Sequence, residues 1–278
     1  MSFPEPSLVP TAQGRIAVHD NGVDGPAVVL LHGNSTCSQV FEHQFDAPFA
    51  RRYRLVALDL PGHSASDDAA DPDTGYTMPG YAEILLEAIT AHGIERAIVF
   101  GWSLGGHIAI EFLPRWPGLV ALSFVGTPAV RPGAETIGLG FPATPHVGLS
   151  GQEVFNDAEA EAYARRTCGQ AGFAPFLVDA VRRTDGRARR IMMGSAIAGI
   201  GLDEREAVAG SPVPLGVFTG EHDEFVNGDY ITGLTYARLW RGRVQVLDGL
   251  GHAPFREAPQ VWNPLFEAFL DDVTAGRI

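Results

Sequence analysis

One stretch of the sequence, AIVFGWSLGG at residues 97–106, joins a short apolar run to a helical pattern. The run 97–100 predicts a strand buried on both faces, and residues 104–113 predict a helix that ends before Pro114. A Gly-x-Ser-x-Gly pattern lies at the junction, where a tight turn needs small residues on either side of a serine. We therefore predict a nucleophile elbow with Ser103 at its tip. The alternative is a glycine-rich turn that carries a solvated serine.

Strands and helices alternate on both sides of this stretch. Further strands are expected at apolar runs that adjoin loops rich in Gly, Asn, Asp or Pro, namely 15–19, 27–31, 54–58, 119–125, 214–219 and 243–247. The helical spacing of apolar residues predicts helices at 78–92 and 260–273. This alternation predicts an α/β protein with a mostly parallel sheet, helices on both faces and right-handed crossovers.

The alternation stops in the middle of the chain, where β-branched runs are scarce. Helices are expected there at 154–166, 175–183 and 186–193. Ser150 and Glu153 have the spacing of a capping box before the first of these helices. We therefore predict a core domain formed by residues 1–127 and 211–278, with a helical cap, or lid, inserted at 128–210.

Composition restricts the class of ligand and the compartment. The formal net charge of −13 disfavours nucleic acid and anionic membranes and suits a neutral small molecule. Two cysteines, Cys37 and Cys168, are too few for a disulfide framework, although one bridge between them stays open. The sequence has neither a secretory signal pattern nor an apolar run of membrane-spanning length. We expect a cytoplasmic protein, either a monomer or a homodimer.

A serine hydroxyl is a poor nucleophile near neutral pH, so Ser103 needs a base and the base needs an orienting acid. His252, in GLGHAPF at 249–255, follows the last expected strand and is the candidate base. Asp223, in GEHDEFV at 220–226, follows the strand 214–219 and is the candidate acid. Its neighbours Glu221 and Glu224 have the same chemistry and remain alternatives.

The other histidines have less support as the base. Three of them adjoin motif glycines and are expected to pack or hydrogen-bond locally: His32, His63 and His107. Four have no supporting motif: His19, His43, His92 and His146. His222 is too close to the acid loop.

Acyl transfer also needs donors for the developing oxyanion. The backbone N–H of Leu104 is one candidate, and the N–H of Asn34, in LHGNS at 31–35, is the other. The Asn34 side chain is a candidate substrate contact, or else an Asx-turn residue that holds its loop. No metal is expected, because HExxH, a His-x-His-x-Asp-His run and paired CxxC are absent. No cofactor is expected either, since neither GxGxxG nor a Walker motif occurs.

The sequence resembles the α/β-hydrolases over nearly its whole length. The resemblance includes DLPGHSAS at 59–66, in which Ser64 replaces the usual Gly. A closer resemblance is to the metal-independent N-acyl-homoserine lactonases of this fold, the AidH-type quorum-quenching enzymes. The blocks that carry it are HGNS at 32–35, VFGWSLGGHI at 99–108, YARRTCG at 163–169, RTDGRARRIM at 183–192 and GHAPFREAP at 251–259. Two blocks lie in the expected cap, which shapes the substrate pocket in this fold.

The resemblance implies roles for residues outside the elbow. Tyr163 would reach the substrate head group together with Asn34, unless it only packs within the cap. The family usually has a carboxylate, often Glu, at the position of Asp223, and the shorter Asp should still reach His252. Trp102 and Phe225, with Phe141 from the cap, are candidates for an acyl-chain channel. The basic residues Arg187, Arg189 and Arg190 are expected on a solvated helix face.

The implied reaction is the opening of the lactone ring of an N-acyl-homoserine lactone by Ser103 through an acyl-enzyme. A carboxylesterase or a carbon–carbon bond hydrolase is an alternative on the same triad. A haloalkane dehalogenase is disfavoured because it needs a carboxylate in place of Ser103. A slow-turnover ligand receptor, with a cap that recruits a partner, is the alternative from another class.

Overall fold

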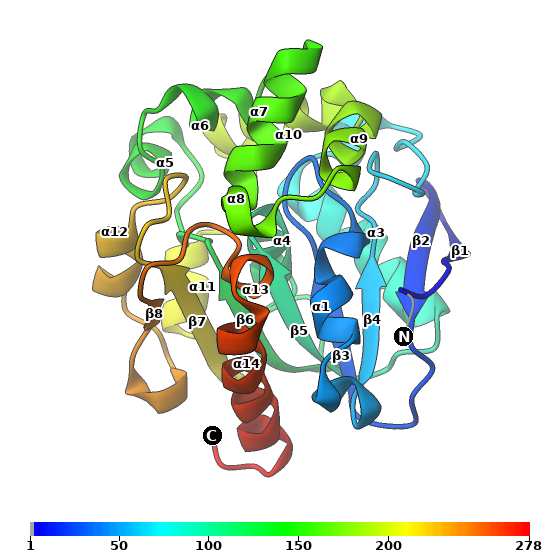
Figure 1. Cartoon of the computed structure of the whole chain (residues 1–278), viewed down its shortest axis with the longest axis vertical. Helices are drawn as coiled ribbons and strands as arrows, with labels where there is room; N and C mark the ends of the chain where they lie inside the picture. The colour runs from blue at the N-terminus through cyan, green and yellow to red at the C-terminus, as the bar shows by residue number, and fades with distance from the viewer. Residues whose placement is uncertain (1–2) are drawn as a thin grey trace.

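The computed structural model describes residues 3–278, which contain an eight-stranded sheet (Figure 1). Its strands are β1 (Ser7–Thr11), β2 (Gly14–Asp20), β3 (Ala27–Leu31), β4 (Arg54–Leu58), β5 (Ala97–Trp102), β6 (Leu119–Val125), β7 (Leu215–Gly220) and β8 (Gln245–Leu247). They follow the order β1-β2-β4-β3-β5-β6-β7-β8. Strand β2 pairs antiparallel with β1 and β4, and all other neighbours are parallel. The predicted fold class and mostly parallel sheet are confirmed.

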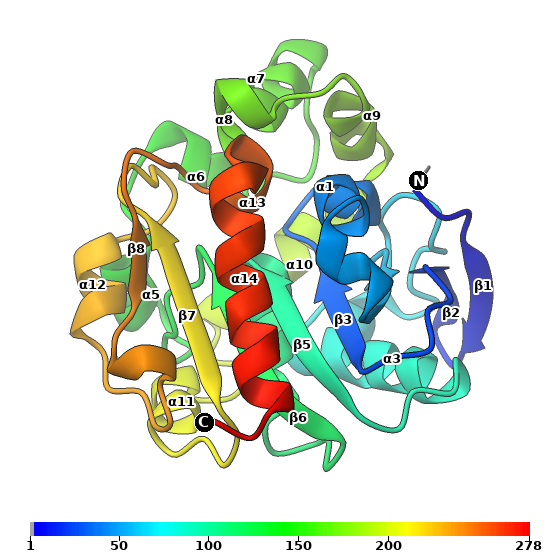
Figure 2. The ribbon, with the colours of Figure 1, turned by 60° about the horizontal axis from the view of Figure 1, so that its bottom comes forward.

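Helices cover both faces of this sheet. Outside the expected cap they are η1 (Ser38–Phe41), α1 (Glu42–Phe45), η2 (Pro48–Arg51), α2 (Pro72–Gly75), α3 (Met78–Ala91), α4 (Leu104–Glu111), α12 (Gly228–Gly233), η3 (Trp240–Gly242), α13 (Pro254–Glu257) and α14 (Pro259–Thr274). Figure 2 shows α1 and α14 in front of the sheet and α3 on its other side. The central strands are therefore enclosed, and Val29, Val56, Val99 and Leu122 are fully buried.

The segment between β6 and β7 is helical. Its helices are α5 (Ala134–Gly140), α6 (Pro145–Leu149), α7 (Asp157–Thr167), α8 (Gly169–Gly172), α9 (Phe176–Arg183), α10 (Gly186–Ile197) and α11 (Glu204–Ala209). Figure 1 shows α5 to α10 gathered over one end of the sheet, and α11 contacts α4. We call α5 to α10 the cap helices.

The predicted capping box is wrong. Asn156 and Glu159 form the box that begins α7, with the Asn156 side chain accepting from Glu159 N and the Glu159 side chain accepting from Asn156 N. Ser150 instead shares a hydrogen bond with Tyr163, and Glu153 pairs with Arg190. Both residue pairs have the same three-residue spacing, so spacing alone does not separate them.

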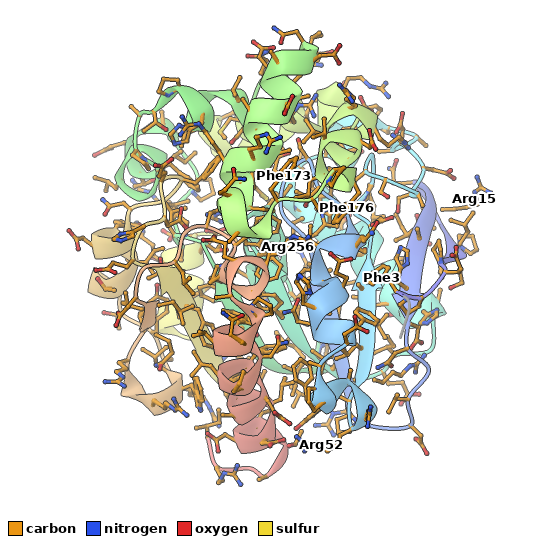
Figure 3. The ribbon with its side chains drawn as sticks, viewed as in Figure 1. Phe3, Arg15, Arg52, Phe173, Phe176 and Arg256 are labelled. Atoms are coloured by element: carbon orange, nitrogen blue, oxygen red, sulfur yellow. The ribbon has the colours of Figure 1, made fainter. Side chains whose placement is uncertain are left out.

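Arg256 of α13 connects the core to the cap helices, as Figure 3 shows near Phe176. Its Nε donates to Gly172 O at 2.6 Å, and its Nη1 donates to Glu42 Oε1 at 3.0 Å. The guanidinium carbon also lies 5.0 Å from the centre of the Phe176 ring. Since Arg256 is 4% exposed, it forms a buried contact between α8, α9 and α1.

The parallel strands bring distant loops to one edge of the sheet. Six strands end beside it, and the segments that follow are 32–37, 59–71, 103, 126–133, 221–227 and 248–253. Ligands of open α/β sheets bind at this carboxyl edge. The cap helices cover it, so any pocket here has walls from both parts of the chain.

Three further features concern the remaining expectations. Strand β1 was not predicted, since its exposed SLVPT sequence lacks a continuous apolar run. Cys37 and Cys168 are both buried free thiols, so no bridge joins them. No helix in residues 3–278 has the length and apolar character needed to cross a bilayer.

Candidate active site

Ser103 lies at the turn between β5 and α4 with a strained backbone, φ 52° and ψ −116°. Its N–H donates to Val125 O at 2.9 Å, which ties the turn to β6. A Cβ at Gly105 would lie 2.2 Å from Leu31 O, and one at Gly101 would lie 2.3 Å from Gly105 O. The glycines therefore permit the close backbone approach that the predicted elbow requires.

His252 and Asp223 form a buried pair beside this turn. His252 Nδ1 lies 2.7 Å from Asp223 Oδ2, and the two side chains are 3% and 1% exposed. Asp223 Oδ1 accepts backbone N–H groups from Phe225 at 2.8 Å and Val226 at 3.3 Å. This partner assigns the ring proton to Nδ1 and leaves Nε2 as the basic atom.

A glycine makes room for the pair. Gly126 has a φ of +61°, and a Cβ there would lie 2.8 Å from two atoms of the His252 ring and 3.3 Å from Asp223 Oδ2. Only a residue without a side chain fits at this point of the loop after β6.

The two alternative acids lie elsewhere. Glu221 accepts the N–H of Gly249 at 2.8 Å, and Glu224 pairs with Arg166 at 3.0 Å. Both carboxylates are at least half exposed. Of the three acidic residues in this loop, Asp223 is the one that contacts His252.

The backbone around His252 is held on both sides. Glu257 accepts the N–H of Gly251 at 2.9 Å through Oε2 and the N–H of Ala253 at 3.0 Å through Oε1. Trp102 Nε1 donates to His252 O at 2.9 Å. Trp102 is fully buried behind the histidine and does not line the pocket, which corrects its expected place in the acyl channel. The indole is held there by this hydrogen bond and by contact with the Phe255 ring.

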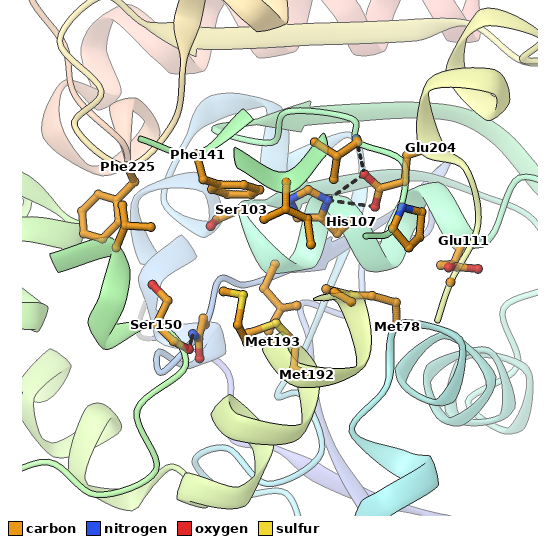
Figure 4. A pocket seen from close by; sticks show the side chains of 18 of the residues that line it. Met78, Ser103, His107, Glu111, Phe141, Ser150, Met192, Met193, Glu204 and Phe225 are labelled. Atoms are coloured by element: carbon orange, nitrogen blue, oxygen red, sulfur yellow. Dashed lines mark hydrogen bonds and ion pairs between the residues drawn. The ribbon is translucent and has the colours of Figure 1, made fainter. Parts of the chain in front are cut away.

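Ser103 and His252 line one pocket, whose empty space is about 880 Å³ when the part open to solvent is included. Asn34, Tyr163, Phe141 and Phe225 also line it, so the structure brings them together as expected. Figure 4 shows much of the remaining wall, which includes Met192 and Met193 of α10. Within residues 3–278, Ser103 Oγ makes no direct hydrogen bond to His252, a contact that often tightens only when substrate binds.

Two backbone donors lie beside Ser103. The N–H groups of Asn34 and Leu104 have no acceptor within the described part of the chain. Leu104 is the first residue of α4, so its N–H belongs to the donor-rich end of a helix. The Asn34 side chain donates to Ser150 O at 2.8 Å and accepts from Ser35 Oγ at 3.0 Å. It therefore joins the loop after β3 to the cap.

Two buried histidines hold that loop, as expected for residues with local hydrogen bonds. His32 Nε2 accepts the N–H of Leu60 at 2.9 Å, and His63 Nε2 accepts the N–H of Ser35 at 3.2 Å. Burial lowers the pKa of His63 to about 3 and lowers the pKa of His32 from its ordinary value. Both rings are therefore neutral acceptors at neutral pH.

Arg189 is the clearest correction to the expected site. It is 3% exposed rather than solvated, whereas Arg187 and Arg190 are exposed as predicted. Its guanidinium donates to Ser35 Oγ at 3.1 Å, to Gln152 O at 2.7 Å and to Glu153 O at 3.0 Å. Burial lowers its pKa from the ordinary arginine value. A cap helix thus supplies a buried cation to the loop that carries Asn34.

Tyr163 of α7 lies in the pocket wall on the same side as Asn34. Its hydroxyl shares a hydrogen bond with Ser150 Oγ at 3.3 Å, and its ring meets Phe225 edge-on. Burial raises the pKa of Tyr163, so the phenol keeps its proton at neutral pH.

One pair in the pocket was not foreseen. His107 Nδ1 lies 2.8 Å and 2.9 Å from the two carboxylate oxygens of Glu204, and both side chains line the pocket. The residues are 97 positions apart, and no sequence signal joins them. Within residues 3–278, no group of three or more His, Cys, Asp or Glu side chains is arranged to hold a metal ion.

The chain belongs to the alpha/beta hydrolase family, because the model of that family matches residues 28–264. Within this family it is similar to the N-acyl homoserine lactonase AidH, which confirms the resemblance. The AidH structure with N-butanoyl homoserine has a TM-score of 0.93 and 42% identity, covering 97% of both chains. A serine-to-glycine variant of AidH with N-hexanoyl homoserine lactone has a TM-score of 0.94 and 41% identity, covering 97% of this chain and 98% of that one.

Other hydrolases are more distant relatives. A 2-(acetamidomethylene)succinate hydrolase of Mesorhizobium japonicum is 27% identical over 280 residues, covering 93% of each chain. A 2-hydroxy-6-oxononadienedioate/2-hydroxy-6-oxononatrienedioate hydrolase of Klebsiella pneumoniae is 34% identical over 110 residues, 38% of each chain. The same family therefore includes enzymes named for different substrates.

Proposed function

We propose that this chain is a serine hydrolase that opens the lactone ring of N-acyl-homoserine lactones. The observation that carries the proposal is the similarity to AidH, which extends over 97% of the chain and so includes the cap. Cap residues shape the pocket in this fold, so similarity there bears on substrate as well as on fold. AidH itself binds N-butanoyl homoserine, an open-chain compound, and its serine variant binds an intact lactone.

In the proposed first step, Ser103 Oγ attacks the lactone carbonyl carbon and His252 Nε2 takes the hydroxyl proton. The 2.7 Å bond between Nδ1 and Asp223 supports this role, because it fixes the tautomer and stabilises the imidazolium that forms. The free N–H groups of Asn34 and Leu104 bind the oxyanion. When the ring C–O bond breaks, His252 returns its proton to the departing alkoxide.

The second step hydrolyses the acyl-enzyme. The released hydroxyl stays tethered to the acyl group and can re-close the ring, so water must compete with it. His252 activates that water and then protonates Ser103 as the open N-acyl-homoserine leaves. Asn34 and Tyr163 line the pocket together and would hold the polar head group. Phe141, beside His107, offers an apolar contact to the acyl chain, and Phe225 packs against Tyr163 on the side of the head group.

Ring opening of a panel of N-acyl-homoserine lactones, followed by pH-stat or mass spectrometry with and without EDTA, tests the proposal. We expect turnover that is insensitive to EDTA and is lost in Ser103→Ala. A panel of p-nitrophenyl esters serves as the control for a general esterase. Ester hydrolysis without any lactone opening would refute the substrate assignment while keeping the serine mechanism.

A carbon–carbon bond hydrolase is the second candidate, favoured by the 34% identity to the Klebsiella enzyme over 110 residues. That match covers 38% of the chain, so it carries less weight than the similarity to AidH. Turnover of a 2-hydroxy-6-oxo-dienoate without turnover of lactones would favour this candidate.

A further inference from the structure

The pocket extends from Ser103 into an arm lined by Met78, His107, Glu111, Val130, Leu202 and Glu204, which we call the His107 arm. Figure 4 shows Ser150 on one side of Ser103 and Met78 with Glu111 on the other. The His107 arm thus points away from the side where Asn34 contacts Ser150. It contains three ionisable side chains in a pocket that is otherwise largely apolar.

Both carboxylates of the His107 arm are already engaged. Glu204 accepts from His107 Nδ1 and also accepts the N–H of Val130 at 2.9 Å. Glu111 accepts the N–H of Leu202 at 2.8 Å and pairs with Arg115. These carboxylates are therefore structural acceptors, and neither needs a ligand.

His107, in contrast, has one unused ring nitrogen. Within residues 3–278, its Nε2 has no hydrogen-bond partner. This nitrogen is also not fully shielded from solvent. Because His107 lines the pocket, this nitrogen faces open space within it. The bond to Glu204 and contact with the Phe141 ring, 5.8 Å between centres, fix the ring orientation.

The position of His107 matches one atom of an acyl chain. Its N–H donates to Ser103 O at 3.2 Å, so the backbone of His107 lies one helical turn along α4 from the elbow, a rise of about 5.4 Å. In an N-acyl-homoserine lactone, C3 of the acyl chain lies five bonds from the lactone carbonyl carbon, roughly 6 Å when extended. A substrate with its lactone at Ser103 and its chain in the His107 arm brings C3 beside this ring.

We propose that His107, oriented by Glu204, determines specificity by recognising an oxygen at C3 of the acyl chain. The inference rests on the proposed lactonase function and adds the substrate class. With Nδ1 donating to Glu204, a neutral ring accepts from a 3-hydroxyl group, whereas a doubly protonated ring donates to a 3-oxo group. An unsubstituted chain leaves Nε2 desolvated and unpaired, which disfavours it.

The substitution His107→Asn tests this directly. The Asn amide nitrogen takes the place of Nδ1 and still donates to Glu204, but no atom replaces Nε2. We compare kcat/KM for N-hexanoyl, N-(3-oxohexanoyl) and N-(3-hydroxyhexanoyl) homoserine lactones. The parent should prefer one of the C3-oxygenated substrates, and the variant should reduce that preference about ten-fold. The matched control His43→Asn, on α1 outside the pocket, should keep the parent preference.

A binding measurement separates this inference from the proposed function. Calorimetric titration of the same three lactones into Ser103→Ala, and into Ser103→Ala with His107→Asn, reports recognition without turnover. If the parent opens no lactone, the proposed function fails and the dissociation constants decide the role of His107. Equal preference with and without His107→Asn overturns the inference, whichever result the turnover assay gives.

A second variant covers the case in which His107→Asn does not fold. Glu204→Gln keeps one oxygen that accepts from Nδ1 but replaces the second carboxylate oxygen near Nδ1 with an amide nitrogen, so the His107 ring is oriented less firmly. Preference for the C3-oxygenated chains over the hexanoyl chain should then fall, though less than in His107→Asn. If both variants keep the parent preference for C3-oxygenated chains, His107 does not recognise the acyl chain.

Discussion

The sheet core and the cap helices hold the pocket in different ways. On the core side, backbone N–H groups hold the two residues: Ser103 N donates to Val125 O, and the N–H groups on either side of His252 donate to the Glu257 carboxylate. Between the cap helices and the core, side chains supply many of the contacts, such as Arg189 from the cap and Arg256 from the core. Segments that lie over a rigid sheet vary more in sequence than the sheet itself. The core is therefore suited to fixed chemistry, and the cap to variation in substrate.

The largest expected effect on activity comes from replacing Asp223, the proposed acid in the core. Asp223→Asn should lower kcat by about 10⁴-fold, because the amide presents a donor to Nδ1 and favours the wrong tautomer of His252. Steady-state hydrolysis of N-hexanoyl homoserine lactone measures this loss. Glu221→Gln and Glu224→Gln are matched controls that should stay within about two-fold of the parent. A large loss in either control would transfer the acid role to that residue.

Among the cap residues, Arg189 is the one that we expect to affect kcat. Arg189→Met removes the donors to Ser35, Gln152 and Glu153, so the loop that carries the Asn34 N–H loses its support. We expect kcat to fall roughly 30-fold with a smaller change in KM, since an oxyanion donor is displaced. The exposed Arg190→Met is the control. Equal effects of the two variants would mean that the cap contributes stability alone.

The core should also differ from the cap in its response to pH. His63 has a pKa of about 3 when folded, so between its unfolded pKa near 6.5 and this value only the unfolded chain binds the proton. The free energy of unfolding should therefore fall as pH decreases through this window, by at most about 1.4 kcal/mol per pH unit from this group.

Urea unfolding between pH 6.5 and 5 measures this slope. His63→Gln keeps an acceptor for Ser35 and should flatten the dependence on pH, whereas His146→Gln in the cap should not. An unchanged slope in His63→Gln would show that the loop histidine is not the source.

The smallest expected effect is on binding of the substrate's polar head group. Tyr163→Phe removes one hydroxyl that bonds to Ser150 Oγ and lines the pocket. KM should rise about five-fold with little change in kcat, the cost of roughly one hydrogen bond. Initial rates over a range of substrate concentrations separate the two constants. A fall in kcat alone would give Tyr163 a role in the transition state rather than in binding.

Sequence patterns predicted the core better than the cap. Continuous apolar runs located β3, β4 and β6 at their observed bounds, because burial on both faces leaves a clear signal. Strand β1 was missed because an exposed edge strand has no such run. In the cap, the short helices α5 and α6 were missed, and the capping box was assigned to the wrong pair.

The site shows the same division. The positions of Ser103, Asp223 and His252 were predictable, since each follows the end of a parallel strand. Arg189 and the His107–Glu204 pair were not, because their burial depends on contacts between distant segments. Ser64, where the resembled family usually has Gly, has a positive φ of 44°.

The backbone at residue 103 has a consequence for how this scaffold diversifies. Its strained conformation is imposed by the surrounding turn and not by the hydroxyl, so cysteine or aspartate there would meet the same backbone strain as serine. Exchange of one side chain can therefore change the nucleophile while the fold remains intact. The elbow therefore accepts different nucleophiles, and new reactions can evolve at this position without a change in the sheet.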